Sequence, residues 1–155
     1  MRSFSDNMHQ QWNLSLTLGK VRNLRDKLGL DLLNPQHHLQ VLNSLTDRMA
    51  FVFLLCESQA KEYEVDVDEF EERLMGDGFA DDASVAFLEE LSDFFQRLGQ
   101  VGLAKITQRS IKTMKAGKER MTQMIANGHF DSLLDTVEKE MEQLLPENAG
   151  SGSQS

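Results

Sequence analysis

The stretch that decides the fold is Val65–Phe95, VDVDEFEERLMGDGFADDASVAFLEELSDFF. It is dense in acidic residues and holds five of the nine phenylalanines of the 155-residue chain. Asp66 followed by Glu69 is an acidic analogue of a capping box, which places both carboxylates near the positive end of a helix. Asp81 and Asp82 are expected to cap a second helix. The stretch therefore predicts two helices joined by the glycine-containing turn MGDGF.

The apolar residues of this stretch recur at helical spacing. The first helix would bury Val67, Phe70 and Leu74, and the second carries a wide stripe formed by Ala83, Phe87, Leu91, Phe94, Phe95 and Leu98. A hydrophobic core and a partner-binding surface both need such side chains, so the sequence does not divide them between the two roles. The candidate partner-binding residues here are Phe70, Leu74, Phe87, Leu91, Phe94 and Phe95.

The N-terminal segment predicts a short β-hairpin followed by a helix. In WNLSLTL, every second residue from Trp12 to Leu18 is apolar, which is typical of a half-buried strand, and Phe4 could pair with it across the turn. From Leu18 to Leu28 the apolar spacing becomes helical, and Gly29 is a natural residue to end that helix.

Two more helices are expected before the central stretch. Asn34 and Pro35 form an N-cap and first-turn pair, and Leu39, Leu42 and Leu45 would form the apolar face of the helix that follows. Thr46 or Asp47 would cap the next helix, whose body is MAFVFLLCESQAKEY. Its eight-residue apolar run, 49–56, also suits a buried strand, but the caps and the ESQAKEY continuation favour a helix.

The C-terminal third predicts two more helices. Residues 103–126 form a basic amphipathic helix, in which Lys105, Arg109 and Lys112 are candidate partner-binding residues. Asp131 or Ser132 would cap a last helix with Leu133, Val137, Met141 and Leu145 on one side and Pro146 past its end. The predicted fold is a mainly α single domain over residues 1–146, with a hairpin (1–18), a helical body (18–98), C-terminal helices (103–145) and a flexible tail (147–155).

Charge is unevenly distributed along the chain, whose net charge is −9. Residues 57–95 carry −12, whereas residues 96–124 carry +6. The basic helix could pair with acidic helices of its own chain, or bind an acidic partner helix or a second subunit. Overall acidity and the lack of interleaved aromatic residues argue against a third possibility, nucleic-acid binding.

Motifs that carry chemistry are missing from the sequence. There is no GxSxG or GxxxxGK[ST] pattern, and an EF-hand alignment ending at Glu69 fails because Ala60 and Tyr63 occupy positions that need a ligand and a glycine. His9, His37, His38 and His129 lack metal-ligand spacing and are predicted to be surface residues. Cys56 lies in an apolar run and is predicted to be a buried, unreactive thiol. We therefore expect no catalytic site, metal or cofactor.

The sequence also predicts a protein that does not enter a membrane. The N-terminal residues, MRSFSDNMHQQWN, contain no apolar signal segment, and the longest apolar run is far shorter than the ~20 residues that a spanning helix needs. We expect a soluble, cytoplasmic protein.

The chain resembles a family of small phage proteins. The segments MRSFSDN, WNLSLTLGKVRNLRDKLGLDLLN, VFLLCESQAKEYEVDVDEFEERLMGD and FLEELSDFF are similar in layout to the tail assembly chaperones of long-tailed phages and gene-transfer agents. The resemblance covers residues 1–95 and extends more loosely beyond them. It implies a non-enzymatic chaperone in the cytoplasm of a bacterial host, which binds hydrophobic helices of the tape-measure protein during tail assembly. An alternative is a small helical virion protein, such as a head–tail connector component, that forms a homo-oligomer.

Overall fold

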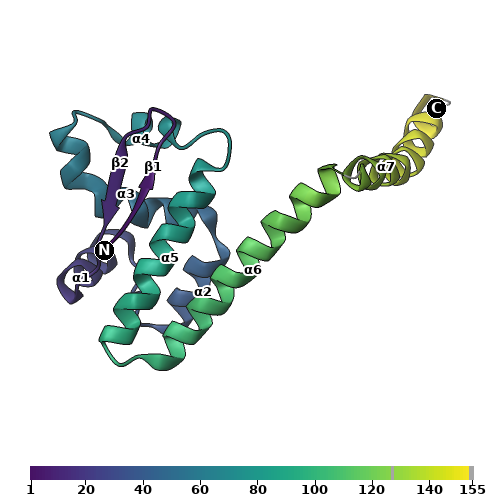
Figure 1. Ribbon diagram of the computed structural model, residues 1–155. Coiled ribbons are helices and arrows are strands. Elements are labelled where there is room, and N and C mark those ends of the chain that lie inside the picture. The colour runs from purple at the N-terminus through teal and green to yellow at the C-terminus, as the bar shows by residue number, and fades with distance from the viewer. Residues whose placement is uncertain (127, 154–155) are drawn as a thin grey trace. The chain divides into compact units, whose positions relative to one another are not determined.

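A computed structural model describes residues 1–126 and 128–153, with side chains at 1–126, 128 and 131–144. Within these residues the chain is mainly helical, with a two-stranded antiparallel sheet at the N-terminus, as predicted (Figure 1). It divides into two compact units, Met1–Lys112 (unit 1) and Thr113–Ser155 (unit 2). The predicted single domain over residues 1–146 stays a prediction.

The N-terminal hairpin consists of β1 (Arg2–Ser5) and β2 (Gln11–Leu14), with Phe4 opposite Trp12. The buried carboxylate of Asp6 organises the loop between them, because it accepts hydrogen bonds from the amides of Met8 and Gln10 and from Trp12 Nε1. The hairpin is therefore fixed both by its strand pairing and by a charged group beneath its turn.

The helices of unit 1 begin and end at residues with clear local roles. They are α1 (Leu18–Leu28), α2 (Pro35–Asn43), α3 (Leu45–Glu62), α4 (Val67–Arg73), α5 (Phe79–Arg97) and the first part of α6 (Val101–Ala126). Asn34 caps α2 and Asp66 caps α4, as predicted. Gly29 ends α1 with a left-handed φ of 71°, which a residue with a Cβ adopts only under strain.

Helix α5 lies at the centre of unit 1, with β1 and α3 packed against it (Figure 1). The fully buried aromatic side chains of the unit are Trp12, Phe51, Phe70, Phe87 and Phe95. Phe51 of α3 stacks on Phe87 of α5 with 5.9 Å between ring centroids. The α-helical interpretation of the apolar run 49–56 is confirmed, since this run lies within α3.

Three predicted helix caps were wrong. One is the cap of α7 (His129–Ser153), because Asp131 and Ser132 lie inside this helix and not before it. Ser44, not Thr46 or Asp47, caps α3, because its hydroxyl accepts a hydrogen bond from the amide of Asp47. Helix α5 begins after Gly78, whose left-handed φ of 81° turns the chain without any side-chain cap. Asp81 and Asp82 lie inside its first turn, where their charge is favourable to the helix dipole.

Two predicted apolar faces were partly wrong. On α2 the buried residues are His38, Val41 and Leu42. Leu39 is exposed, and so is Leu45, which is the first residue of α3. His38 is buried because its ring hydrogen-bonds to Thr107 in the core, so the face of α2 that carries His38 points inward. In the central stretch Val67, the first residue of α4, is exposed, whereas Phe70, one turn later in the same helix, is buried.

The second unit contains the end of α6 and helix α7 (His129–Ser153). We expected α7 to end before Pro146, but it continues to Ser153. Proline has a helical φ, so the backbone can continue at the loss of one hydrogen bond, to the carbonyl of Glu142. Of the predicted tail, 147–153 is helical and 154–155 lies outside the described residues.

A helix that spans a bilayer must be both long and apolar. Within the described residues, no single helix is long and apolar enough to do so. The pair α2 and α3 meets these requirements only jointly, and it is bent by 103°.

Candidate functional site

The six apolar residues predicted to bind a partner all lie in the core of unit 1. Their exposed fractions do not exceed 4%; they are Phe70, Leu74, Phe87, Leu91, Phe94 and Phe95. Phe70 contacts Trp12 with 4.9 Å between ring centroids, and Phe95 packs against His38. The sequence left open whether these residues form the core or a partner-binding surface. All six are buried in the core, and none of them offers exposed surface to a partner.

The three basic candidates lie on the opposite side of α6 from its buried face. Lys105, Arg109 and Lys112 are exposed, whereas Ala104, Thr107 and Ile111 are buried in unit 1. Positions i, i+4 and i+7 share one helix face, so the structure brings the three basic side chains together. They form a charged outer face of the helix.

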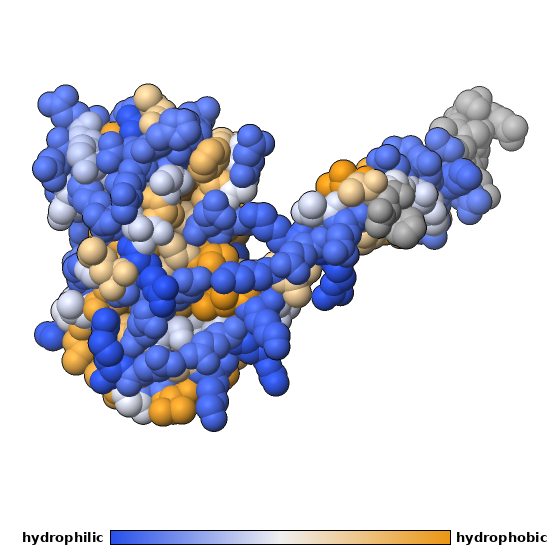
Figure 2. Space-filling view, in the orientation of Figure 1, coloured by the Kyte–Doolittle hydropathy of each residue, from blue (hydrophilic) through white to orange (hydrophobic). Residues whose placement is uncertain are grey.

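Exposed large apolar side chains occur in both units, and those of unit 2 lie along its two helices. Its exposed large apolar side chains, 46–72% exposed, form what we name the C-terminal stripe: Met121 and Ile125 of α6, and Leu133, Leu134, Val137, Met141 and Leu144 of α7. Every described side chain of α7 from 131 to 144 is exposed. Hydrophilic and apolar residues both reach the surface of this part of the chain (Figure 2).

Spacing places the α7 residues of the stripe on one side of the helix. Leu134, Val137, Met141 and Leu144 are separated by three, four and three residues, which is the spacing of a coiled-coil seam. Acidic residues flank this seam, among them Glu138 and Glu140. An amphipathic helix gains most of its stability by burying its apolar side, and the described part of this seam is exposed. Leu145 is also predicted to lie on this side of the helix, but its side chain lies outside the described residues.

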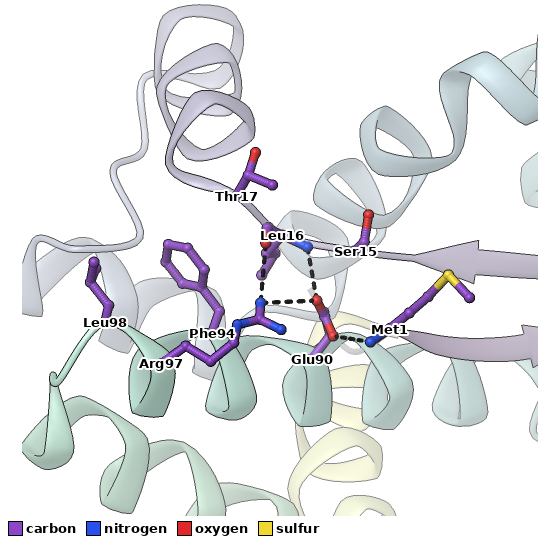
Figure 3. Close-up of a pocket in the computed structure, with 8 residues that line it drawn as sticks. All are labelled: Met1, Ser15, Leu16, Thr17, Glu90, Phe94, Arg97 and Leu98. Carbon is purple, nitrogen blue, oxygen red and sulfur yellow. Dashed lines mark hydrogen bonds and ion pairs between the residues drawn. The ribbon is translucent and has the colours of Figure 1, made fainter.

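A cavity of about 450 Å³ lies in unit 1 between the end of the hairpin and α5 (Figure 3). Its lining consists of Met1, Ser15, Leu16, Thr17, Glu90, Phe94, Arg97 and Leu98. The buried Glu90 carboxylate accepts a hydrogen bond from the Leu16 amide at 2.8 Å, and its oxygens lie 3.3 Å from the Met1 ammonium and 3.7 Å from Arg97 Nη2. This acid therefore has a structural role, anchoring the chain after β2.

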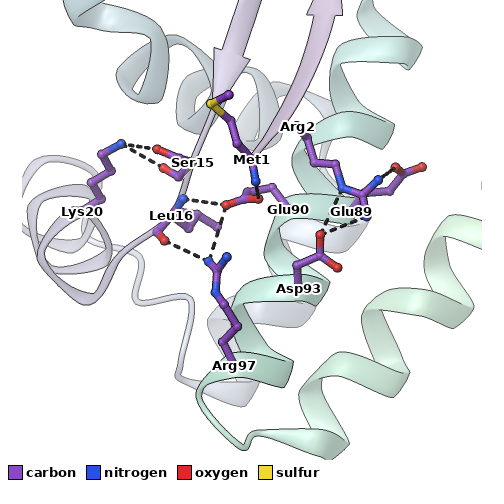
Figure 4. Close-up of polar contacts among 9 residues, drawn as sticks. All are labelled: Met1, Arg2, Ser15, Leu16, Lys20, Glu89, Glu90, Asp93 and Arg97. Carbon is purple, nitrogen blue, oxygen red and sulfur yellow. Dashed lines mark hydrogen bonds and ion pairs between the residues drawn. The ribbon is translucent and has the colours of Figure 1, made fainter.

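Further polar contacts attach the hairpin to α5 (Figure 4). The Arg2 guanidinium donates to Asp93 at 2.9 Å and lies 3.1 Å from Glu89. Arg97 Nη2 donates to the Leu16 carbonyl at 3.2 Å. Both carboxylates, of Glu89 and Asp93, come from the acidic central stretch, so part of its negative charge serves to hold the hairpin in place.

The buried side chains of Cys56, His38 and Asp6 have shifted pKa values. Burial raises the pKa of the Cys56 thiol to about 12, so the thiol stays protonated. Burial also lowers the pKa of His38, which favours the neutral ring. For Asp6, burial acts to raise the pKa, but hydrogen bonds from Trp12, Gln10, Met8 and Arg73 together outweigh it and lower the value.

Sequence reasoning missed several of these polar groups. His38 was predicted to lie at the surface, but it is fully buried and hydrogen-bonded to Thr107. Arg48 is buried and donates to the Val41 and Leu42 carbonyls, which satisfies the end of α2. The sequence gives only weak signals of this burial. Arg48 directly precedes the apolar run 49–56, and His38 is adjacent to Leu39.

In the part of the chain that the structure describes, no group of three or more His, Cys, Asp and Glu side chains could hold a metal ion. Comparisons with family models, with curated proteins and with solved structures find no match to this chain.

Proposed function

We propose that this protein is a non-enzymatic, phage tail assembly chaperone-like protein that binds apolar helices of a tape-measure protein in the host cytoplasm. The observation that carries the proposal is the C-terminal stripe, an exposed apolar surface on an amphipathic helix. The resemblance of residues 1–95 supplies the class of partner. The physics of the stripe supplies the mode of binding.

The mode is packing of one helix against another. A partner helix with apolar residues every three or four positions matches the spacing of Val137, Met141 and Leu144. Burying such side chains contributes roughly 25 cal/mol per Å² of apolar area removed from water. The acidic residues beside the stripe stay in water and keep the complex soluble.

Unit 1 has a different part in this proposal. Its fully buried aromatic side chains, such as Phe87 and Phe95, form the core, and the carboxylate of Glu90 is engaged by Leu16, Arg97 and the Met1 ammonium. Unit 1 thus acts as the folded carrier of the binding helices. We assign it no reaction.

The second candidate is a structural protein of the virion, such as a head–tail connector component. The heptad spacing on α7 favours it equally, because the same seam suits a permanent contact between neighbouring subunits. Mass spectrometry of purified particles separates the two functions. A chaperone is absent from mature particles, whereas a connector component is present in a fixed number of copies.

Co-expression with the cognate tape-measure protein tests the chaperone proposal. The wild-type chain should raise the soluble fraction of the tape-measure protein and co-purify with it. The double variant Val137→Glu/Met141→Glu should do neither, because it places two charges in the stripe. As a matched control, Asp135→Lys/Glu142→Lys also changes two exposed α7 residues but leaves the stripe apolar, and it should behave like wild type. No gain in solubility with the wild-type chain would reject the proposal.

A further inference from the structure

Both helices of unit 2 carry the spacing of a coiled-coil seam. On α7 the seam positions are Leu134, Val137, Met141 and Leu144; on the unit 2 part of α6 they are Met114, Lys118, Met121 and Ile125. Each set follows the alternating steps of three and four residues. One lysine at a seam position is a known device for fixing register, because its stem packs in the seam and its ammonium reaches the edge.

The residues beside the two seams carry opposite charge. On α7 the flanking positions next to Val137 and Met141 are Glu138 and Glu140, and both are exposed. On α6 the flanking residue is Lys115, in addition to Lys118 within the seam, and these two are exposed as well. Two α7 helices side by side would bring carboxylates together, and two α6 helices would bring ammonium groups together. Only the pair of α6 with α7 is complementary.

This complementarity identifies the occupant of the stripe when no other protein is bound. We infer that a second copy of this chain covers it, with α6 of each copy packed against α7 of the other in a two-fold symmetric dimer. Every copy supplies one basic and one acidic seam, so a two-fold arrangement satisfies both at once. Within one chain the apolar side chains of the two seams do not bury each other, since Met121 and Ile125 of α6 and the described α7 side chains from 131 to 144 are exposed.

The inference deepens the proposed function, because it rests on the same surface. A dimer hides the stripe until an apolar helix of the partner competes for it, and release of the partner restores the dimer. Self-association would thus regulate the chaperone and protect an apolar surface that otherwise invites aggregation.

Charge reversal tests the inference in the full chain. Sedimentation equilibrium of the wild-type protein should give a mass that rises with concentration to that of two chains. Glu138→Lys/Glu140→Lys should shift the mass to that of one chain. Adding Lys115→Glu/Lys118→Glu to the same chain should restore the dimer, and this rescue also shows that the first variant was folded. The control Asp135→Lys/Glu142→Lys, with the same charge change away from the seam, should remain dimeric.

Two results would overturn the inference: a wild-type chain that stays monomeric at every concentration, or a dimer whose mass is unaffected by the reversal. The proposed function fails separately. A monomeric charge-reversal variant that still solubilises the tape-measure protein leaves the chaperone proposal intact, and a wild-type dimer that solubilises nothing rejects that proposal while the inference stands.

Discussion

The imidazole Nε2 of His38 lies 2.8 Å from the hydroxyl oxygen of Thr107, in the interior of unit 1. The Thr107 hydroxyl donates its own hydrogen to the Leu103 carbonyl at 2.8 Å, so it accepts from the ring and the proton is assigned to Nε2. Within the described residues, the buried Nδ1 has no hydrogen-bond partner. This contact attaches the start of α6 to α2, and burial of the ring, with no partner in the described chain for a second proton at Nδ1, favours the neutral histidine.

The first prediction concerns pH. The folded-state pKa of His38 is lowered from its ordinary 6.5, so below that value the unfolded chain takes up a proton that the folded chain does not. The free energy of unfolding should therefore fall as the pH is lowered through this range. Urea unfolding at pH 7 and at about pH 5 measures it. His38→Gln should lose part of this pH dependence, whereas His9→Gln, at an exposed site, should retain all of it.

The hydroxyl of Thr107 can be tested directly. Thr107→Val leaves the Nε2–H of His38 buried without an acceptor, which costs about 1–3 kcal/mol of stability. Thr107→Ser keeps the hydroxyl and should cost less, so a similar loss in the two variants would show that the hydrogen bond is unimportant. Denaturant midpoints give the comparison.

A third prediction concerns Asp6. Its lowered pKa means that the ionised carboxylate stabilises the fold above the ordinary value of 3.8, and this stability is lost as the pH falls through the folded-state pKa. Asp6→Ala leaves the Trp12 indole N–H and two loop amides without their acceptor, and should cost about 3 kcal/mol near neutral pH. Because Trp12 is the single tryptophan, its fluorescence reports the unfolding. A variant as stable as wild type would contradict this role.

The fourth prediction separates core from surface. Phe87→Ala removes a fully buried ring and should destabilise unit 1 by about 3–5 kcal/mol. Val137→Ala, at a half-exposed position in unit 2, should leave the unfolding of unit 1, followed by Trp12 fluorescence, unchanged. Equal effects of the two substitutions would mean that the aromatic residues of α5 are not the main core.

The sequence predicted the elements of this protein better than their faces. The hairpin, the caps at Asn34 and Asp66 and the end at Gly29 all depend on local chemistry, and each is confirmed. The cap at Ser44 was missed because three of the four residues in Ser44–Asp47 have side chains that can accept a backbone hydrogen bond, and the local sequence does not select one of them. At the start of α5, Gly78 occupies the cap position, whereas Asp81 or Asp82 was expected there. All of these residues are common near helix starts, so the local sequence does not decide between them.

The candidate site was harder to predict, because burial depends on contacts distant in sequence. The phenylalanines of α5 and the leucines of α7 have the same helical spacing, yet Phe87 is fully buried and Leu144 is 72% exposed. What differs is the set of neighbours: α5 has β1 and α3 against it. Buried polar residues such as His38 and Glu90 have partners far away in the sequence, at Thr107 and Leu16, so no local pattern marks them.

The most direct test of the central claim is photo-crosslinking from single positions of α7 during co-expression with the tape-measure protein. A photoreactive residue placed at Val137, in the stripe, should yield a covalent adduct with the tape-measure protein. The same residue at Lys139, on the polar side of α7, should yield little or none. Adducts from neither position, or equal adducts from both, would contradict binding through the C-terminal stripe.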